Sequence, residues 1–149
     1  RDAGRAAAPA GVQVATGTPA LQAALAGARV LVNLLPLTPD TRGLIDAALL
    51  ARLPRGAAVV NLARGAHVVD ADLLAALADG HIGHAVLDVF HAEPLAADHP
   101  FWTHPQVTVL PHVAAQTDER SAAAVVAANI TALAAGAPLR HLVQRDAGY

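Results

Sequence analysis

Three continuous apolar runs, separated by stretches long enough to hold a helix, constrain the fold of this chain most. The runs are RVLVNLLP at 29–36, AAVVNL at 57–62 and HAVLDVF at 84–90. A crossover between parallel strands requires a dozen or more residues, usually with a helix, and the stretches between the runs meet this requirement. Continuously apolar strands are typical of a sheet that is covered on both faces. The pattern therefore predicts an α/β fold with a doubly wound, Rossmann-like parallel sheet.

Helix start and stop signals occupy the segments between and beyond these runs. Thr18 stands before a proline and an apolar stretch, where an N-cap is expected, and Asp70 has a similar position. Gly80 follows the second of these stretches, as glycine often does at the end of a helix. The helices are expected at 18–28, 40–54, 70–80 and 117–136, and VTVL at 107–110 is expected to form a fourth strand.

The composition restricts the class of protein. Hydrophobic residues make up 54% of the 149 residues, which is enough for one domain with a core of its own. The formal charge is -2, with 10 lysines and arginines, so no basic surface indicates binding to nucleic acid. Charges, prolines or glycines interrupt every apolar stretch well short of the ~20 residues that a membrane span needs. We therefore expect a soluble protein that binds neither nucleic acid nor membrane.

The chain contains neither methionine nor cysteine. Without methionine, Arg1 cannot be an unprocessed translation start, so we expect the sequence to be a piece of a longer protein. The lack of cysteine excludes disulfides and thiolate chemistry, and it is compatible with a reducing compartment. No secretory signal pattern opens the chain, and we expect a cytoplasmic location.

Residues capable of chemistry follow the predicted strands at the ends where ligands bind in this kind of sheet. In open α/β sheets, ligands lie outside the carboxyl ends of the strands. Arg64 follows the second run, Asp88 and Glu93 follow the third, and His112 follows the fourth strand. The sequence therefore predicts that an arginine, two acids and a histidine gather at one edge of one sheet.

These side chains suit acid catalysis on an anionic substrate. The guanidinium fork of Arg64 can take a carboxylate bidentately, although a structural ion pair is the alternative for an arginine considered alone. A carboxylate beside His112 stabilises the protonated imidazole, which then serves as a general acid near neutral pH, and Glu93 is the candidate for that carboxylate.

The other histidines do not indicate a metal site. His81 and His84 are expected to flank a turn, while His91, His99 and His104 are expected in a loop. Their spacing matches no structural zinc motif and cysteine is missing, so no metal is expected.

Four ordered blocks resemble the NAD(P)-dependent D-2-hydroxyacid dehydrogenases. The blocks are VLVNLLPLTPDTRGLID, VVNLARGAHVVDADLLAALADGHI, AVLDVFHAEPL and HPQVTVLPHVAAQT, and they extend from about residue 29 to 117. Within that family, NLLP, NLARGAHVV, the pair Phe101-Trp102 and the closing AGY are most similar to the glyoxylate/hydroxypyruvate reductases of the bacterial A type.

The resemblance implies a reduction of a small 2-oxo acid to a 2-hydroxy acid. Arg64 would bind the substrate carboxylate and polarise the keto group, and His112 would protonate the carbonyl oxygen as hydride arrives. Glu93 would orient His112 and keep it protonated. Trp102 would form a wall of the substrate pocket, with a role in the core or in a subunit contact as the alternative.

The resemblance also implies NADP, or NAD, as cofactor. Asp88 would contact the nicotinamide amide. The other residues implied to contact the cofactor, besides Arg64 and His112, are Leu35, Pro36 and Thr41 on the adenosine side, together with Leu62 and Ala63. Arg1 or Arg5 would lie where a cation favours the ribose phosphate of NADP.

One departure from the family is large, because no GxGxxG phosphate-binding loop occurs in the sequence. We therefore expect residues 1–116 to be a partial dinucleotide-binding domain. Residues 117–149 are expected to be a C-terminal helix and tail that return to an absent substrate domain. The resemblance further implies a homodimer with a small 2-oxo acid as its substrate.

Two other kinds of function stay open at this point. The protein could be a non-catalytic nucleotide sensor or a corepressor-like protein, since some members of this superfamily resemble dehydrogenases and act by binding partners. Without the glycine loop, the chain could also be an inactive fragment. Within the enzyme class, a phosphoglycerate- or lactate-type dehydrogenase is the alternative to a glyoxylate/hydroxypyruvate reductase.

Overall fold

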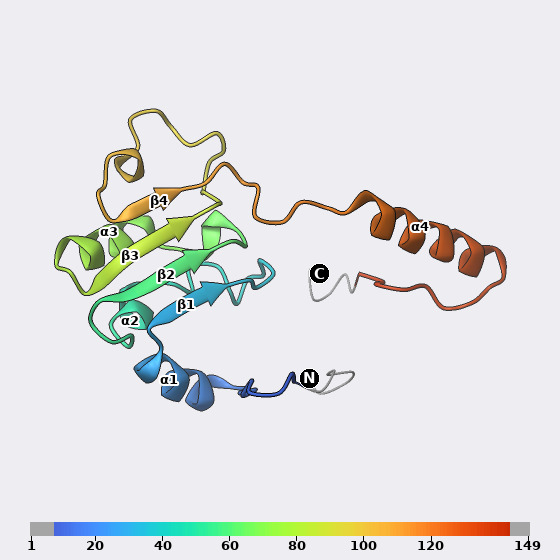
Figure 1. Cartoon of the computed structure of the whole chain (residues 1–149), viewed down its shortest axis with the longest axis horizontal. Helices are drawn as coiled ribbons and strands as arrows, with labels where there is room; N and C mark the ends of the chain where they lie inside the picture. Colours follow the sequence, from blue (N-terminus) through green and yellow to red (C-terminus); the bar gives the residue numbers. More distant parts are fainter. Residues whose placement is uncertain (1–7, 144–149) are drawn as a thin grey trace.

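A four-stranded parallel sheet forms the centre of the structure, a computed structural model that describes residues 8–143. The strands lie side by side in chain order, β1-β2-β3-β4 (Figure 1). They are β1 (Val30–Asn33), β2 (Ala57–Asn61), β3 (Ile82–Leu87) and β4 (Val107–Val109). The predicted parallel, Rossmann-like architecture is confirmed, because each connection carries the chain back to the same edge before the next strand begins.

The register of the strands brings their carboxyl ends together. Asn33 pairs with Asn61, Asn61 with Leu87, and Leu87 with Val109. Because these four residues lie in one row across the sheet, the loops that follow them leave from one edge. That edge is where ligands bind in sheets of this kind.

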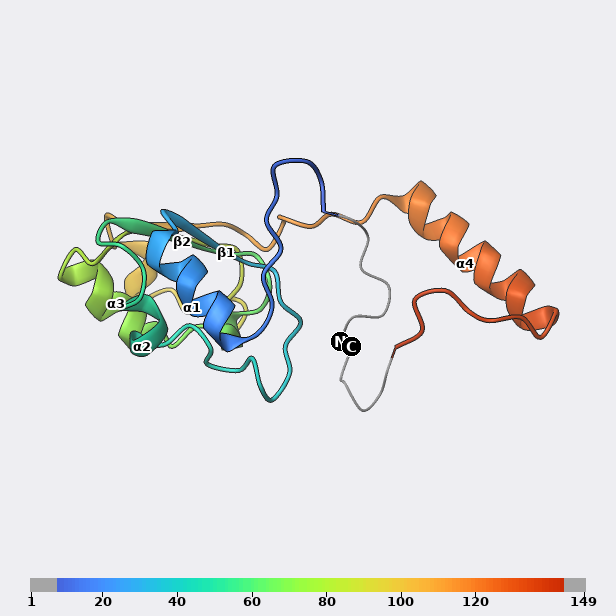
Figure 2. The same cartoon turned by 90° about the horizontal axis from the view of Figure 1, so that it is seen from below.

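Helices α2 and α3 lie on the same side of the sheet in Figure 2. The helices are α1 (Thr18–Gly27), α2 (Ala47–Leu50), α3 (Asp70–Ala78) and α4 (Glu119–Ala134), with 3-10 turns η1 (Gly65–His67) and η2 (Pro100–Trp102). The core lies between the sheet and helices α1, α2 and α3, and it includes Leu50, Val59, Leu73, Ile82 and Phe101, each almost fully buried.

The opposite face of the sheet is open, so the prediction of a sheet covered on both faces is wrong for the described residues. Buried and less buried residues alternate along β2. On the open side, Val30 is 55% exposed and Val32 is 49% exposed. An apolar strand is buried on both faces only where another element packs on each face of the sheet. Within residues 8–143, no element packs over Val30 and Val32.

The predicted helix over 40–54 contains only the four helical residues of α2. Gly43 has φ +64°, a left-handed conformation that interrupts a helix. Ile45 instead forms an isolated parallel bridge with Val68, and its N–H donates to the carbonyl of His67 at 2.8 Å. Asp46 then caps α2 by accepting the Leu49 N–H at 2.8 Å. The apolar residues whose spacing predicted one long helix therefore belong to a β-bridge and a short helix instead.

Two helices have their N-cap one residue earlier in the chain than predicted. Gly17 is the N-cap of α1 and Thr18 is its first helical residue. Val69 is the N-cap of α3, and Asp70 belongs to the first turn. The carboxylate of Asp70 is not used to cap the helix because it faces His91 and His99, which lie 3.6 and 3.8 Å away.

Strand β3 begins and ends earlier than the predicted span 84–90. It covers Ile82–Leu87, because the chain turns at Asp88 to reach the segment after β4. His84, which was expected beside a turn, therefore lies within β3, and its Nε2 is 2.9 Å from the hydroxyl of Thr108 on β4.

Helix α4 stands apart from the sheet in both views (Figures 1 and 2). It begins after Asp118, whose side chain accepts the Ser121 N–H at 2.8 Å, and ends before Gly136 with φ +64°. Most of its large apolar side chains are exposed, including Ile130 at 64% and Leu133 at 70%. Between residues 8 and 143, no helix is both long and apolar enough to cross a membrane.

Candidate active site

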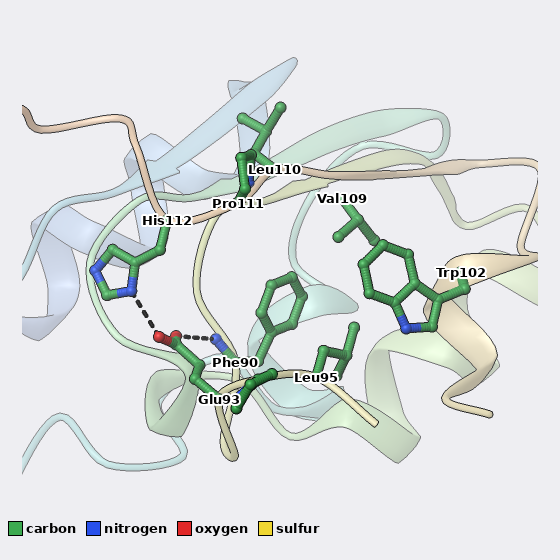
Figure 3. Close-up of a pocket in the computed structure, with 9 residues that line it drawn as sticks. Phe90, Glu93, Leu95, Trp102, Val109, Leu110, Pro111 and His112 are labelled. Atoms are coloured by element: carbon green, nitrogen blue, oxygen red, sulfur yellow. Dashed lines mark hydrogen bonds and ion pairs between the residues drawn. The ribbon is translucent and has the colours of Figure 1, made fainter. Parts of the chain in front are cut away.

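A histidine and a glutamate from different loops form a hydrogen-bonded pair at the carboxyl edge of the sheet. His112 follows β4 and Glu93 lies in the loop after β3, yet Nδ1 of His112 is 2.7 Å from Oε2 of Glu93 (Figure 3). The second carboxylate oxygen of Glu93 accepts the Phe90 N–H at 2.9 Å. The carboxylate is thereby fixed at both oxygens, and the imidazole keeps its Nε2 turned away from Glu93 (Figure 3).

The surroundings of Glu93 favour its ionised form. The hydrogen bond from His112 is the largest cause that lowers the pKa of Glu93, and the hydrogen bond from the Phe90 N–H adds to it. The charge of Arg64 contributes in the same direction. Since an ionised carboxylate is a better partner for a protonated imidazole, Glu93 is suited to hold His112 as a general acid.

Arg64 lies in the turn after β2, with an exposed side chain. Its Nη1 donates to the carbonyl of the preceding residue, Ala63, at 2.6 Å. The charge of Arg64 is the smallest of the causes that lower the pKa of Glu93. Arg64, Glu93 and His112 thus all follow strands at the carboxyl edge of the sheet.

Two buried asparagines hold the turn that carries Arg64, and sequence reasoning missed both. Asn61 is fully buried and Asn33 is 5% exposed. The amide of Asn33 donates to Oδ1 of Asn61 at 3.0 Å, and Nδ2 of Asn61 donates to the Arg64 carbonyl at 2.9 Å. The signal was present, since each of these two apolar runs contains one polar residue near its end, in NLLP and NLAR.

Asp88 supports the segment that carries His112. It is 1% exposed, and its two carboxylate oxygens accept the N–H groups of Val113 and Ala114, both at 2.9 Å. His112 itself has φ 57°, which is uncommon for a residue other than glycine and is often found at functional sites. Asp88 thus fixes, by hydrogen bonds, the backbone of the two residues that follow His112, whose own backbone is in the left-handed region. Its predicted contact with nicotinamide stays a prediction.

The residues predicted for the adenosine side lie in the turn after β1. The hydroxyl of Thr41 donates to the Pro36 carbonyl at 2.8 Å and accepts the Thr38 N–H at 2.8 Å. The Leu35 N–H donates to Oδ1 of Asn33 at 3.2 Å. This turn is therefore connected to the same asparagine pair as the Arg64 turn.

The remaining predicted cofactor residues differ in placement. Leu62 and Ala63 lie in the turn between β2 and Arg64, and Ala63 is 6% exposed. Its N–H donates to Oδ1 of Asn61 at 3.2 Å. Arg1 and Arg5 lie outside the described residues.

The carboxyl edge fits the ring parts of a dinucleotide. Leu34 is 70% exposed and Leu35 is 44% exposed directly after β1, so the edge offers apolar surface beside the turns described above. A planar base or nicotinamide ring can pack on such a surface. The pyrophosphate would need backbone N–H groups at a helix start, and no glycine-rich loop of that kind occurs in the sequence.

A cavity of about 320 Å³ adjoins the His112–Glu93 pair (Figure 3). Trp102 forms one wall, 51% exposed, and its Nε1 donates to the Ala96 carbonyl at 2.8 Å. Trp102 therefore lines a cavity and is not a core residue, while its place in a substrate pocket stays a prediction. The other lining residues are Phe90, Pro94, Leu95, Val109, Leu110 and Pro111.

The remaining histidines do not assemble a metal site. In the part of the chain that the structure describes, no three histidine or acidic side chains are placed to hold one ion. His81 lies beside the Leu50 carbonyl at 3.0 Å, and His91 beside the Val68 carbonyl at 2.7 Å. His91 also lies 3.6 Å from the carboxylate of Asp70, so these two histidines have backbone and carboxylate partners within the fold.

Comparison with known proteins assigns the chain to a family. Residues 5–114 match the profile described as "D-isomer specific 2-hydroxyacid dehydrogenase, NAD binding domain". The chain belongs to the D-isomer specific 2-hydroxyacid dehydrogenase family. It is similar to a glyoxylate/hydroxypyruvate reductase A of Serratia proteamaculans (strain 568), with 49% identity over 139 residues, 93% of this chain and 44% of the relative. The chain thus spans less than half of this curated family member.

Two solved structures of the family are also similar. One is a D-isomer specific 2-hydroxyacid dehydrogenase from Xanthobacter autotrophicus Py2 in complex with NADPH and MES (TM-score 0.91, 46% identity, 97% of this chain and 60% of that chain). Another is an NADPH-dependent glyoxylate/hydroxypyruvate reductase from Sinorhizobium meliloti in complex with NADP and sulfate (TM-score 0.84, 44% identity, 90% of this chain and 44% of that chain). The fold described above is therefore that of the cofactor-binding part of this family.

Proposed function

We propose that the protein reduces a small 2-oxo acid, glyoxylate or hydroxypyruvate, to the corresponding 2-hydroxy acid. The observation that carries the proposal is the 2.7 Å pair of His112 and Glu93, located where the charge of Arg64 also acts on the glutamate. The reductases of Serratia proteamaculans and Sinorhizobium meliloti, to which the chain is similar, are named for these two substrates.

The residues have distinct roles in this reaction. Arg64 binds the substrate carboxylate through its guanidinium fork and orients the neighbouring keto group. His112 donates a proton from Nε2 to the carbonyl oxygen while hydride adds to the carbonyl carbon. Glu93 holds the imidazole by Nδ1 and stabilises the protonated form before the transfer.

We propose NADPH, or NADH, as the hydride donor. The proposal rests on the apolar Leu34 and Leu35 surface, on the turn of Pro36 and Thr41, and on similarity to two structures that contain NADPH or NADP. Leu62, Ala63, Arg64, Asp88 and His112 complete the proposed contact set. When bound, the nicotinamide supplies the hydride.

We propose two parts for the chain and a homodimer for the protein. Residues 1–116 would form a partial dinucleotide-binding domain, and residues 117–149 would form the C-terminal helix and tail that return to a substrate domain. The exposed apolar side of α4 supports a partner surface. We also propose a cytoplasmic location, which the lack of cysteine supports.

The proposed function is tested by following NADPH oxidation with glyoxylate and with hydroxypyruvate, in the longest form of the protein that its gene encodes. We expect turnover, and we expect Arg64→Ala to lower kcat/KM roughly 30- to 1000-fold, the equivalent of about 2–4 kcal/mol of lost charge stabilisation. Arg52→Ala is the matched control, because Arg52 is an exposed arginine between α2 and β2, near the opposite edge of the sheet.

Equal rates in the Arg64→Ala and Arg52→Ala proteins would exclude the proposed role of Arg64. NADPH binding without turnover on either oxo acid would contradict the reductase and favour a nucleotide-sensing protein.

A further inference from the structure

The backbone at Gly65 lies against the backbone of the loop that carries Glu93. A Cβ atom added to Gly65 would be 1.9 Å from the carbonyl carbon of Phe90 and 2.4 Å from the backbone nitrogen of His91. Both are backbone atoms, which cannot rotate aside as a side chain can. Gly65 is not among the residues with positive φ, so its glycine is required by the close approach alone.

This contact joins the two segments that carry the catalytic residues. Gly65 directly follows Arg64, and Phe90 donates its N–H to Oε1 of Glu93 at 2.9 Å. The other oxygen of Glu93 receives the bond from His112. The position of the Phe90 peptide against Gly65 therefore determines how far Glu93 and His112 lie from Arg64.

His91 makes a second contact between the Glu93 loop and the segment that follows Arg64. Its Nε2 is 2.7 Å from the Val68 carbonyl and 3.6 Å from Oδ1 of Asp70, which also faces His99. Val68 and Asp70 follow η1, the short turn that begins at Gly65. The loop is therefore held to the Gly65–Asp70 segment at two points.

We propose that Gly65 is a positioning residue, which sets the distance between Arg64 and the Glu93–His112 pair because it has no side chain. The inference rests on the proposed reductase function, in which these three side chains act on one substrate. It does not require Gly65 to touch the substrate.

The experiment compares Gly65→Ala with Gly83→Ala in the longest form that the gene encodes. A Cβ at Gly83 would be 2.7 Å from the Gly56 carbonyl oxygen, so this variant is also crowded against backbone, but near the amino end of β3. Because a misplacement of about 1 Å can cost about 100-fold in rate, we expect Gly65→Ala to lower kcat about 100-fold. We expect the kcat of Gly83→Ala to stay within about threefold of wild type, since Arg64, Glu93 and His112 lie at the other edge.

A second measurement reports the position of Glu93 without activity. In the wild type, hydrogen bonds from His112 and Phe90 lower the pKa of the Glu93 carboxyl below 4.5. Carbon NMR titration of labelled glutamate, assigned with Glu93→Gln, should show this pKa moving up towards 4.5 in Gly65→Ala. It should stay unchanged in Gly83→Ala.

If Gly65→Ala does not fold, as judged by circular dichroism, His91→Ala tests the position of the Glu93 loop instead. This substitution removes a side chain and does not crowd the backbone. Loss of its bond to Val68 should release the loop and raise the pKa of Glu93. An unchanged Glu93 pKa in whichever variant folds, with kcat equal to that of Gly83→Ala, would overturn the proposal. A shifted pKa in a protein without reductase activity would support the positioning role and contradict the proposed function instead.

Discussion

In the proposed reaction, the hydrogen bond between His112 and Glu93 prepares a proton for transfer. Glu93 is partly exposed, so its charge acts on His112 through a partly solvated contact, and direct hydrogen bonding matters more than long-range attraction. The 2.7 Å contact at Nδ1 also leaves Nε2 as the nitrogen that can reach a substrate. Orientation and charge are therefore supplied by the same side chain.

Glu93→Gln removes the charge while keeping the shape of the side chain. The pKa of Glu93 is below 4.5 in the folded protein, because His112 and Phe90 donate hydrogen bonds to its carboxylate. This group stabilises the fold above pH 4.5, and the contribution is lost as pH falls through the lowered pKa. We expect the difference in unfolding free energy between wild type and Glu93→Gln to shrink below pH 4.5, as measured by urea denaturation at several pH values.

Glu119→Gln is the control for this titration, because Glu119 is the other glutamate of the sequence and lies in α4. A wild-type protein whose difference from Glu93→Gln did not change between neutral pH and pH 3 would contradict the ionised role of Glu93.

At the scale of an element, the segment after β4 depends on a buried carboxylate in the segment after β3. Asp88 accepts two backbone N–H groups just beyond His112, which has a left-handed backbone. Asp88→Asn would leave one of these N–H groups facing an NH₂ group. We expect a loss of about 1–3 kcal/mol in unfolding free energy and a lower kcat, measured by urea denaturation and by the reductase assay.

Asp118→Asn tests whether the lower kcat expected of Asp88→Asn depends on the position of Asp88 near the site. Asp118 also accepts a backbone N–H, from Ser121, but at the start of α4 and away from the site. We expect the kcat of this variant to equal that of wild type. If Asp88→Asn kept full activity despite a lower stability, the connection from Asp88 to His112 would be unnecessary for catalysis.

At the scale of the whole molecule, exposed apolar surface occurs in two places, the open face of the sheet and α4. Val126, Ile130 and Leu133 lie on one side of a helix that stands apart from the sheet, and each is more than half exposed. Soluble proteins rarely leave such a stripe in water, so contact with other protein surface is expected.

We expect sedimentation equilibrium to give twice the mass of one chain for the wild-type protein. Ile130→Glu should shift the equilibrium towards monomer, because it places a charge on the apolar side of α4. Ala124→Glu in the same helix serves as a control for the loss of helix stability. A dimer equally stable in both variants would place the subunit contact outside this part of α4.

The sequence by itself determined the parallel sheet, the four strands and the edge at which we propose that the reaction occurs. Apolar runs separated by helix-length connections can be satisfied by few arrangements, and Arg64, Glu93 and His112 were predicted from their positions after strands. The glycine at 65 and the asparagines at 33 and 61 were visible but had no interpretation. Their role depends on which backbone lies opposite, and no local pattern contains that information.

Only the tertiary structure decided how these residues meet. The 2.7 Å bond between Glu93 and His112 joins residues of two different loops that are 19 positions apart in the sequence. The close approach of Gly65 to Phe90, the burial of Asp88 and the breakdown of the predicted helix at Gly43 depend likewise on contacts with distant residues. Periodicity and propensity describe neighbours along the chain, whereas a site is made from backbone positions that packing alone brings together.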